Sequence, residues 1–203
     1  CAVASQAYTS QIVSIVMMAL VLSEDRMGVA QRRRAIIDDL QRLPSLVAQV
    51  LKMDSVIQQL AEELKEKRSL LLLGRGYQFA ACVEGALKIK EIAYMHSEGL
   101  LAGELKHGPL ALVDETMPVL LICMRDRCFE KTMNAYAQLL ARKSRPIVMC
   151  NVGDEGHFKD ALSVIPIPKC EDALQVRCER SVRCDKCLPA FMCALCSRPF
   201  FFS

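Results

Sequence analysis

The sequence predicts an α/β protein, in which a parallel sheet with helices on both faces follows a helical segment. Two observations predict this fold. From residue 69 onward, short apolar runs alternate with longer stretches of helical periodicity, as they do in βαβ units. Before residue 69, only helical periodicity is found. A chain of 203 residues that is 52% hydrophobic can bury the core of one such domain together with a helical extension.

The helical segment contains three stretches with helical periodicity, and we expect helices over residues 8–22, 30–43 and 53–67. Pro44 is predicted to end the second helix, because proline lacks the N–H for the helical hydrogen bond and its ring clashes with the preceding turn. The first third of the chain is therefore expected to be helical throughout.

The apolar runs beyond this segment are expected to form four strands, at residues 69–73, 118–124, 146–150 and 164–167, with helices over 78–94 and 130–142. Gly74-Arg75-Gly76 makes the turn from the first strand into its helix. Ligands of parallel α/β sheets bind beyond the carboxyl ends of the strands. We therefore place the charged stretch 84–114 at that edge of the sheet.

Composition argues against two classes of partner. The net charge is only +3, and Lys and Arg are spread along the chain, so we expect no nucleic-acid partner. The longest apolar run, residues 12–22, has about half of the ~20 residues that a membrane-spanning helix needs. We expect it to be a core helix, with no membrane partner.

Cysteines are frequent, but their positions do not suggest a disulfide framework. Cys82, Cys123, Cys128 and Cys150 fall in or beside helix and strand patterns, where cysteine usually behaves as a small buried hydrophobe. We therefore expect a reducing, cytoplasmic setting.

Residues 176–203 have no sustained helical or strand period, and they contain two Cys-x-x-Cys pairs, which begin at Cys184 and Cys193. Only five residues separate the pairs, whereas zinc ribbons usually leave ~15 or more. This spacing argues against zinc and favours a segment foreign to the fold. We expect no metal and no cofactor.

The charged stretch contains a cluster on one face of its helix. Glu84, Lys88 and Glu91 follow the spacing i, i+4, i+7, which places them within an arc of about 60°. One interpretation is a solvated face braced by ion pairs. The other is an acid/base site, in which a partly desolvated carboxylate beside a lysine acts as a general base.

The loops on either side of that helix suggest two further features. Gly74-Arg75-Gly76 brings backbone N–H groups and an arginine to the start of a helix, where an anion is favoured, although a plain turn explains the glycines equally well. His107 precedes Gly108-Pro109 and is expected on an irregular loop, as a proton-transfer group or as an exposed side chain. His96 is expected to cap or pack.

The stretch GRGYQFAACVEGALKIKEIAYMHSEGLLAGELKHGPLALVD, residues 74–114, closely resembles the sugar-isomerase (SIS) region of the glutamine:fructose-6-phosphate aminotransferases. The resemblance runs from about residue 3 to residue 175. It implies flavodoxin-like SIS subdomains that convert fructose 6-phosphate and ammonia into glucosamine 6-phosphate. It also implies a glutaminase domain as the source of ammonia.

The resemblance implies roles for individual residues. Glu91 matches the base that moves a proton between C1 and C2 of the sugar, and Lys88 and Glu84 match its partners on the helix. His107 matches the ring-opening histidine, which in the family reaches the active site of a neighbouring subunit, so a homodimer or larger homo-oligomer is expected. VASQAYTSQ resembles a family segment whose valine and serine touch the sugar, here Val3 and Ser5, although this copy lacks the family's threonine.

The resemblance also implies an organisation. Residues 69–175 match the second SIS subdomain, and residues 1–68 match a helical segment that links it to a first subdomain with the phosphate loop, expected before Cys1. Residues 176–203 stand where the family has its Schiff-base lysine, as a frame or splice divergence would produce. We therefore expect the chain alone to be inactive. Two alternatives stay open, namely a non-catalytic SIS module that binds a phosphosugar to regulate a partner, and a fragment without a ligand.

Overall fold

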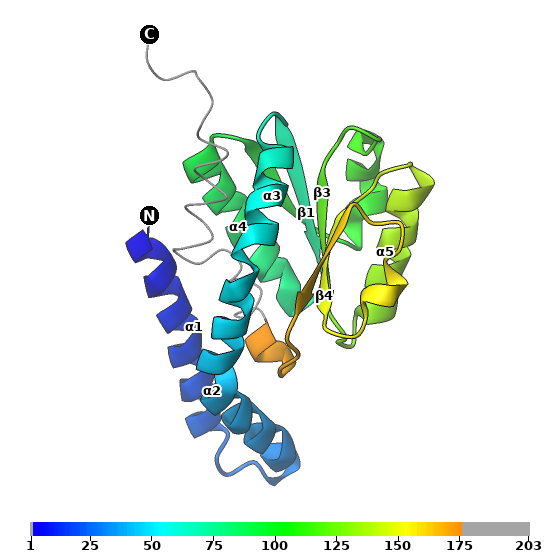
Figure 1. Ribbon diagram of the computed structural model, residues 1–203. Coiled ribbons are helices and arrows are strands. Elements are labelled where there is room, and N and C mark those ends of the chain that lie inside the picture. Colours follow the sequence, from blue (N-terminus) through cyan, green and yellow to red (C-terminus); the bar gives the residue numbers. More distant parts are fainter. Residues whose placement is uncertain (1, 176–203) are drawn as a thin grey trace.

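A five-stranded parallel sheet forms the centre of the structure, a computed structural model that describes residues 2–175, with side chains from residue 10 onward (Figure 1). The strand order is β2-β1-β3-β4-β5, so the order of strands reverses between β1 and β3. Every neighbouring pair is parallel. The strands are β1 (Ser69–Gly74), β2 (His96–Leu101), β3 (Val119–Cys123), β4 (Ile147–Asn151) and β5 (Ser163–Ile167). The predicted parallel sheet is confirmed.

Helices cover both faces of this sheet, as predicted. The face that carries Leu70 and Leu72 packs against α2, α3 and α4, and the face that carries Leu71 and Leu73 packs against α5. Figure 1 shows α5 and the α2–α4 group on opposite sides of the strands. The α-helices are α1 (Ala2–Leu22), α2 (Ala30–Val50), α3 (Asp54–Leu64), α4 (Tyr77–Ala93) and α5 (Phe129–Ala141). Short 3₁₀ turns occupy Met27–Val29, Leu51–Met53, Glu104–His107, Pro109–Leu112 and Glu155–His157.

The prediction missed β2. This strand lies at the edge of the sheet, so Ser97 is buried while His96 and Glu98 face solvent, and no apolar run marks it. Its Gly99 is needed for packing, because a Cβ there would lie only 2.6 Å from the backbone nitrogen of Val83 on α4. Polar edge residues and a glycine thus stand where pattern analysis expects apolar side chains.

The prediction that Pro44 ends the second helix was wrong. Helix α2 continues through Pro44 to Val50, and both Leu46 and Val50 are buried in the core beneath it. Burial of these side chains outweighs the loss of one helical hydrogen bond, which is the way tertiary packing commonly overrides local propensity.

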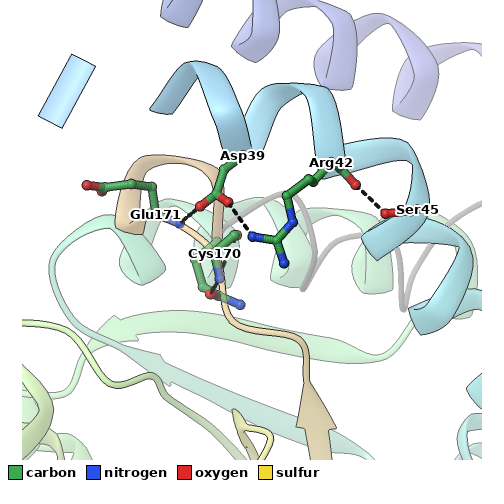
Figure 2. A network of polar contacts seen from close by, with 6 residues as sticks. Asp39, Arg42, Ser45, Cys170 and Glu171 are labelled. Carbon is green, nitrogen blue, oxygen red and sulfur yellow. Dashed lines mark hydrogen bonds and ion pairs between the residues drawn. The ribbon is translucent and has the colours of Figure 1, made fainter. Parts of the chain in front are cut away.

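Polar contacts join α2 to the chain that follows β5 (Figure 2). The carboxylate of Asp39 accepts a hydrogen bond from the backbone N–H of Glu171 at 2.7 Å and another from Arg42 at 3.3 Å. The side chain of Glu171 lies 3.8 Å from the guanidinium of Arg32. Nearby, the Gln175 amide oxygen accepts a bond from the Cys170 N–H at 3.0 Å. The helical segment is therefore tied to the far end of the sheet.

Three of the four cysteines expected in the core are buried there, namely Cys82, Cys123 and Cys150, whereas Cys128 is partly exposed at the start of α5. Cys123 and Cys150 face each other across β3 and β4, and both are free thiols. Burial raises the pKa of each thiol from 9.0 to about 12. Since the thiolate is the reactive form, these two thiols are expected to be chemically inert.

We therefore predict that iodoacetamide at pH 8 leaves Cys123 and Cys150 unmodified in the native chain under conditions that modify Cys128. At this pH, well below a pKa of about 12, the thiolate is a negligible fraction of each buried thiol. Peptide mass spectrometry after timed alkylation measures the order. Labelling of Cys123 as fast as that of Cys128 would contradict the prediction, and alkylation in urea supplies the unprotected control.

Within residues 2–175, no helix is both long enough and apolar enough to cross a membrane.

Candidate active site

Helix α4 carries the predicted acid/base cluster along the length of the sheet. It leaves the carboxyl end of β1 and reaches the amino end of β2, so it runs antiparallel to both strands. The Ser97 hydroxyl near the start of β2 donates to the Ala86 carbonyl at 2.7 Å. Glu91, more than one turn beyond Ala86, therefore lies at the amino edge of the sheet.

The expectation that the whole stretch 84–114 lies at the carboxyl edge was therefore wrong. The stretch divides between the two edges, because β2 carries the chain back along the sheet. Gly74-Arg75-Gly76 and residues 102–113 lie at the carboxyl edge, and the end of α4 with Glu91 lies at the amino edge. The error arose because β2 was not predicted. Without that strand, nothing in the prediction carried the chain from one edge of the sheet to the other.

Glu84, Lys88 and Glu91 do share one flank of α4. The Lys88 Nζ lies 2.7 Å from Glu91 Oε2 and 4.0 Å from Glu84 Oε1. The side chains of Lys88 and Glu84 are only 13% and 17% exposed, whereas that of Glu91 is 42% exposed. If these residues formed only an ion pair on a solvated helix face, the Lys88 side chain would be exposed to water. The half-buried arrangement is therefore closer to the acid/base interpretation.

The arrangement leaves Glu91 able to exchange a proton. One carboxylate oxygen is held by the Lys88 ammonium, and within the described residues the other oxygen has no hydrogen bond. A carboxylate that is oriented by a cation and open on its other side can act as a general base toward a bound carbon acid. Glu84 lies one helical turn before Lys88 and contributes a second negative charge to the lysine.

His107 ends a short 3₁₀ turn, Glu104–His107, and its side chain is exposed. The turn is anchored by Leu105, which is fully buried, and it stops at Gly108, whose φ of 147° is open to glycine alone. Pro109 then begins a second 3₁₀ turn. The expected break of the helix at Gly108-Pro109 is confirmed.

Strand β2 lies between Glu91 and His107 in the chain. The six residues of β2 span roughly 17 Å at ~3.3 Å per residue, so the two side chains come from opposite edges of the sheet. Within one chain, Glu91 and His107 are therefore too far apart to serve the same proton-transfer site, where contacts of about 3 Å are needed.

Three other predicted residues have simpler outcomes. His96 neither caps nor packs, because it begins β2 with an exposed side chain. Val3 and Ser5 lie in the backbone of α1, but their side chains are outside the described part of the structure, so their contact with a sugar stays a prediction. The cysteine pairs at Cys184 and Cys193 also lie outside the described residues.

Sequence analysis overlooked the groups that surround Gly76 at the carboxyl edge. Asp126 and Cys128 follow β3 and lie beside Gly76, at the point where the strand order reverses. Burial raises the pKa of the Asp126 carboxyl, while a hydrogen bond of 2.7 Å from the Cys128 N–H acts in the opposite direction. Their place directly after a predicted strand is the pattern that should have marked them.

Comparison with known proteins agrees with this architecture. The sequence model of the SIS domain matches residues 63–176. The chain is 54% identical over 171 residues to glutamine–fructose-6-phosphate aminotransferase (isomerizing) 2 of Bos taurus, covering 84% of this chain and 25% of that protein. It is 52% identical over 176 residues to the corresponding enzyme of Saccharomyces cerevisiae, covering 84% and 24%. The chain thus spans about a quarter of the length of these relatives.

Among solved structures, the C-terminal domain of glucosamine-fructose-6-phosphate aminotransferase from Francisella tularensis superposes with a TM-score of 0.83 and 29% sequence identity. The match covers 94% of this chain and 53% of that domain. The sheet and the helical segment before it are therefore shared with that domain. The chain belongs to the SIS domain family, and within it is homologous to the C-terminal domain of the glutamine–fructose-6-phosphate aminotransferases.

Proposed function

We propose that this chain supplies part of the isomerase domain of a glutamine:fructose-6-phosphate aminotransferase, which forms glucosamine 6-phosphate from fructose 6-phosphate and glutamine-derived ammonia. Residues 69–175 would be its second SIS subdomain, and a glutaminase domain its ammonia source. The names of the relatives support the reaction. The observation on this chain that carries the proposal is the 2.7 Å contact between Lys88 and the half-exposed Glu91.

In this proposal Glu91 is the general base. Once ammonia has replaced the C2 oxygen of the open-chain sugar as a protonated imine, with loss of water, the free oxygen of Glu91 removes a proton from C1. The neutral C1–C2 enolamine that results takes the same proton back at C2 while the C1 hydroxyl releases its proton to solvent, which leaves an aldehyde at C1 and an amine at C2. Lys88 fixes the carboxylate for both transfers, and Glu84 holds Lys88 from the previous turn of the helix.

His107 opens the sugar ring by moving a proton between the ring oxygen and the anomeric hydroxyl. Because β2 separates it from Glu91 of its own chain, we propose that each site takes Glu91 from one subunit and His107 from another. A homodimer is the smallest assembly that provides this pairing. The exposure of both side chains is compatible with contact to a second copy.

The proposal is tested by replacing Glu91 with Gln in a full-length hybrid enzyme, in which the matched residues of this chain replace the corresponding segment of the Bos taurus relative. The amide keeps an oxygen for Lys88 but cannot accept the proton. We predict that glucosamine 6-phosphate formation falls by about 10²-fold or more, the usual contribution of a general base. Product is measured by mass spectrometry.

Glu98→Gln is the matched control, because Glu98 is an exposed carboxylate on neighbouring β2 with no assigned role, and this variant should keep full activity. If Glu91→Gln retained activity close to that of the unmodified hybrid, the catalytic assignment would fail. A non-catalytic module that binds a phosphosugar would then be the better interpretation.

A further inference from the structure

The guanidinium of Arg75 lies directly against Gly103, the residue that precedes the 3₁₀ turn of His107. A Cβ placed on Gly103 would lie 2.9 Å from Nη1, 3.3 Å from Cζ and 3.4 Å from Nη2 of Arg75. The backbone of Gly103, with φ −72° and ψ −29°, is one that any residue adopts without strain. The space beside Gly103 is therefore filled by the end of the Arg75 side chain, which would have to move aside for any larger residue.

Two other contacts fix the same short segment. The Ala102 N–H donates to the Gly74 carbonyl at 2.9 Å, which joins the segment to the end of β1. Leu105 is fully buried in the core below. The guanidinium of Arg75, beside Gly103, is the third neighbour of this segment. His107 lies two residues beyond Leu105, so its position depends on these contacts.

The backbone of Arg75 is fixed on both sides. It follows β1 between Gly74, which is packed against the start of α4, and Gly76, whose φ of 59° fixes the turn. Within the described part of the chain, the guanidinium makes no ion pair with a carboxylate. Its planar group instead occupies the space beside Gly103, with Nη1, Cζ and Nη2 all within 3.4 Å of the place where a Cβ would lie, a shape that lysine does not reproduce.

We propose that Arg75 is a positioning residue for His107, and that it acts through Gly103. The proposal rests on the proposed function, because it concerns the histidine that opens the sugar ring. Loss of the guanidinium would free Gly103, let the 3₁₀ turn shift, and displace the imidazole from the neighbouring subunit's sugar. Misplacement of a catalytic group by about 1 Å costs up to ~10²-fold in rate.

The first test measures steady-state kinetics of Arg75→Ala in the full-length hybrid. We expect kcat to fall by roughly 10- to 100-fold with KM changed by less than about twofold, since the positioned histidine acts on bound sugar. Arg75→Lys should recover only a small part of the loss, because it restores the charge without the planar group.

Arg127→Ala is the matched control. It removes an exposed arginine from the same edge of the sheet and should leave both kcat and KM unchanged. A rise in KM alone would show that Arg75 binds substrate, and would overturn the proposal.

The second test uses the pair Arg75 and Gly103. Gly103→Ala alone should lower kcat, because the new methyl group displaces the guanidinium from its place beside the segment. In an Arg75→Ala background the same methyl group meets empty space, so Gly103→Ala should be neutral or restore activity. Such a reversal of sign is the signature of direct contact in a double-mutant cycle. Additive losses would overturn the proposal.

The third test does not depend on catalysis. In the 203-residue chain, amide hydrogen exchange across residues 102–108 should be faster in Arg75→Ala than in the unmodified chain and unchanged in Arg127→Ala. Unchanged exchange in Arg75→Ala would overturn the proposal. The failure of the proposed function is recognised separately. Full activity in a His107→Ala hybrid would overturn the role of His107 in ring opening, whereas the exchange data would still decide whether Arg75 orders residues 102–108.

Discussion

Mixing two inactive forms of the hybrid enzyme, one with Glu91→Gln and one with His107→Ala, is expected to restore glucosamine 6-phosphate formation. In each heterodimer, one of the two sites receives an intact Glu91 from one subunit and an intact His107 from the other. With random pairing of equal amounts, roughly a quarter of all sites should be complete. The expectation follows from β2, which holds these two residues of one chain at opposite edges of the sheet.

Activity after mixing, unfolding and refolding the two forms together measures this effect, with heterodimers counted by native mass spectrometry. The control is a double variant that carries both substitutions in one chain, mixed with unmodified subunits. There the heterodimer has one site without damage only if both groups come from one chain. Heterodimers that form without any recovery of activity would refute the shared site.

The largest expected effect on stability is at Gly99, where Ala should destabilise the chain by at least the ~1–3 kcal/mol of ordinary overpacking. A Cβ at this position lies 2.6 Å from the Val83 nitrogen and 2.7 Å from the Cys82 carbonyl carbon. These are backbone atoms of α4, which cannot rotate away, so the helix must move from β2. Unfolding in urea, followed by circular dichroism, gives the change in free energy.

Gly156→Ala is the matched control, because its Cβ would have no atom within 4 Å, and its free energy of unfolding should be unchanged. An equal stability of the Gly99 and Gly156 variants would show that α4 does not press on β2 as described. Since α4 also carries Glu91, a Gly99→Ala hybrid that still folds should lose activity together with stability.

Periodicity and spacing predicted much of this molecule because those features depend on neighbours in the chain. The i, i+4, i+7 spacing of Glu84, Lys88 and Glu91 was enough to place them on one flank of a helix, and the structure confirms it. The apolar runs of β1, β3 and β4 were visible because strands buried on both faces must be apolar, and β5, at the other edge, was visible because it keeps apolar residues at Val164, Ile165 and Ile167. The resemblance to SIS proteins supplied the roles proposed for Glu84, Lys88 and Glu91, which no spacing can provide.

The features that were missed depend on contacts between distant segments. Strand β2 has polar residues because it lies at the edge, and α2 passes through Pro44 because residues beyond it are buried. The contact of Arg75 with Gly103 joins the loop after β1 to the loop after β2, which become neighbours only because those strands are paired. Because β2 was missing from the prediction, neither this contact nor the edge of the sheet at which Glu91 lies could be predicted.

The contacts between α2 and the chain beyond β5 bear on how genes of this family can recombine. Asp39 bonds the backbone of Glu171, and apolar side chains of α2 and α3 complete the core beneath the sheet. A crossover at residues 65–68, between α3 and β1, would combine helices from one parent with a sheet from another across this core. A crossover within residues 23–26, between α1 and α2, keeps α2, α3 and the sheet from a single parent. Shuffled libraries of relatives should therefore retain folded chains far more often with joints at 23–26 than at 65–68.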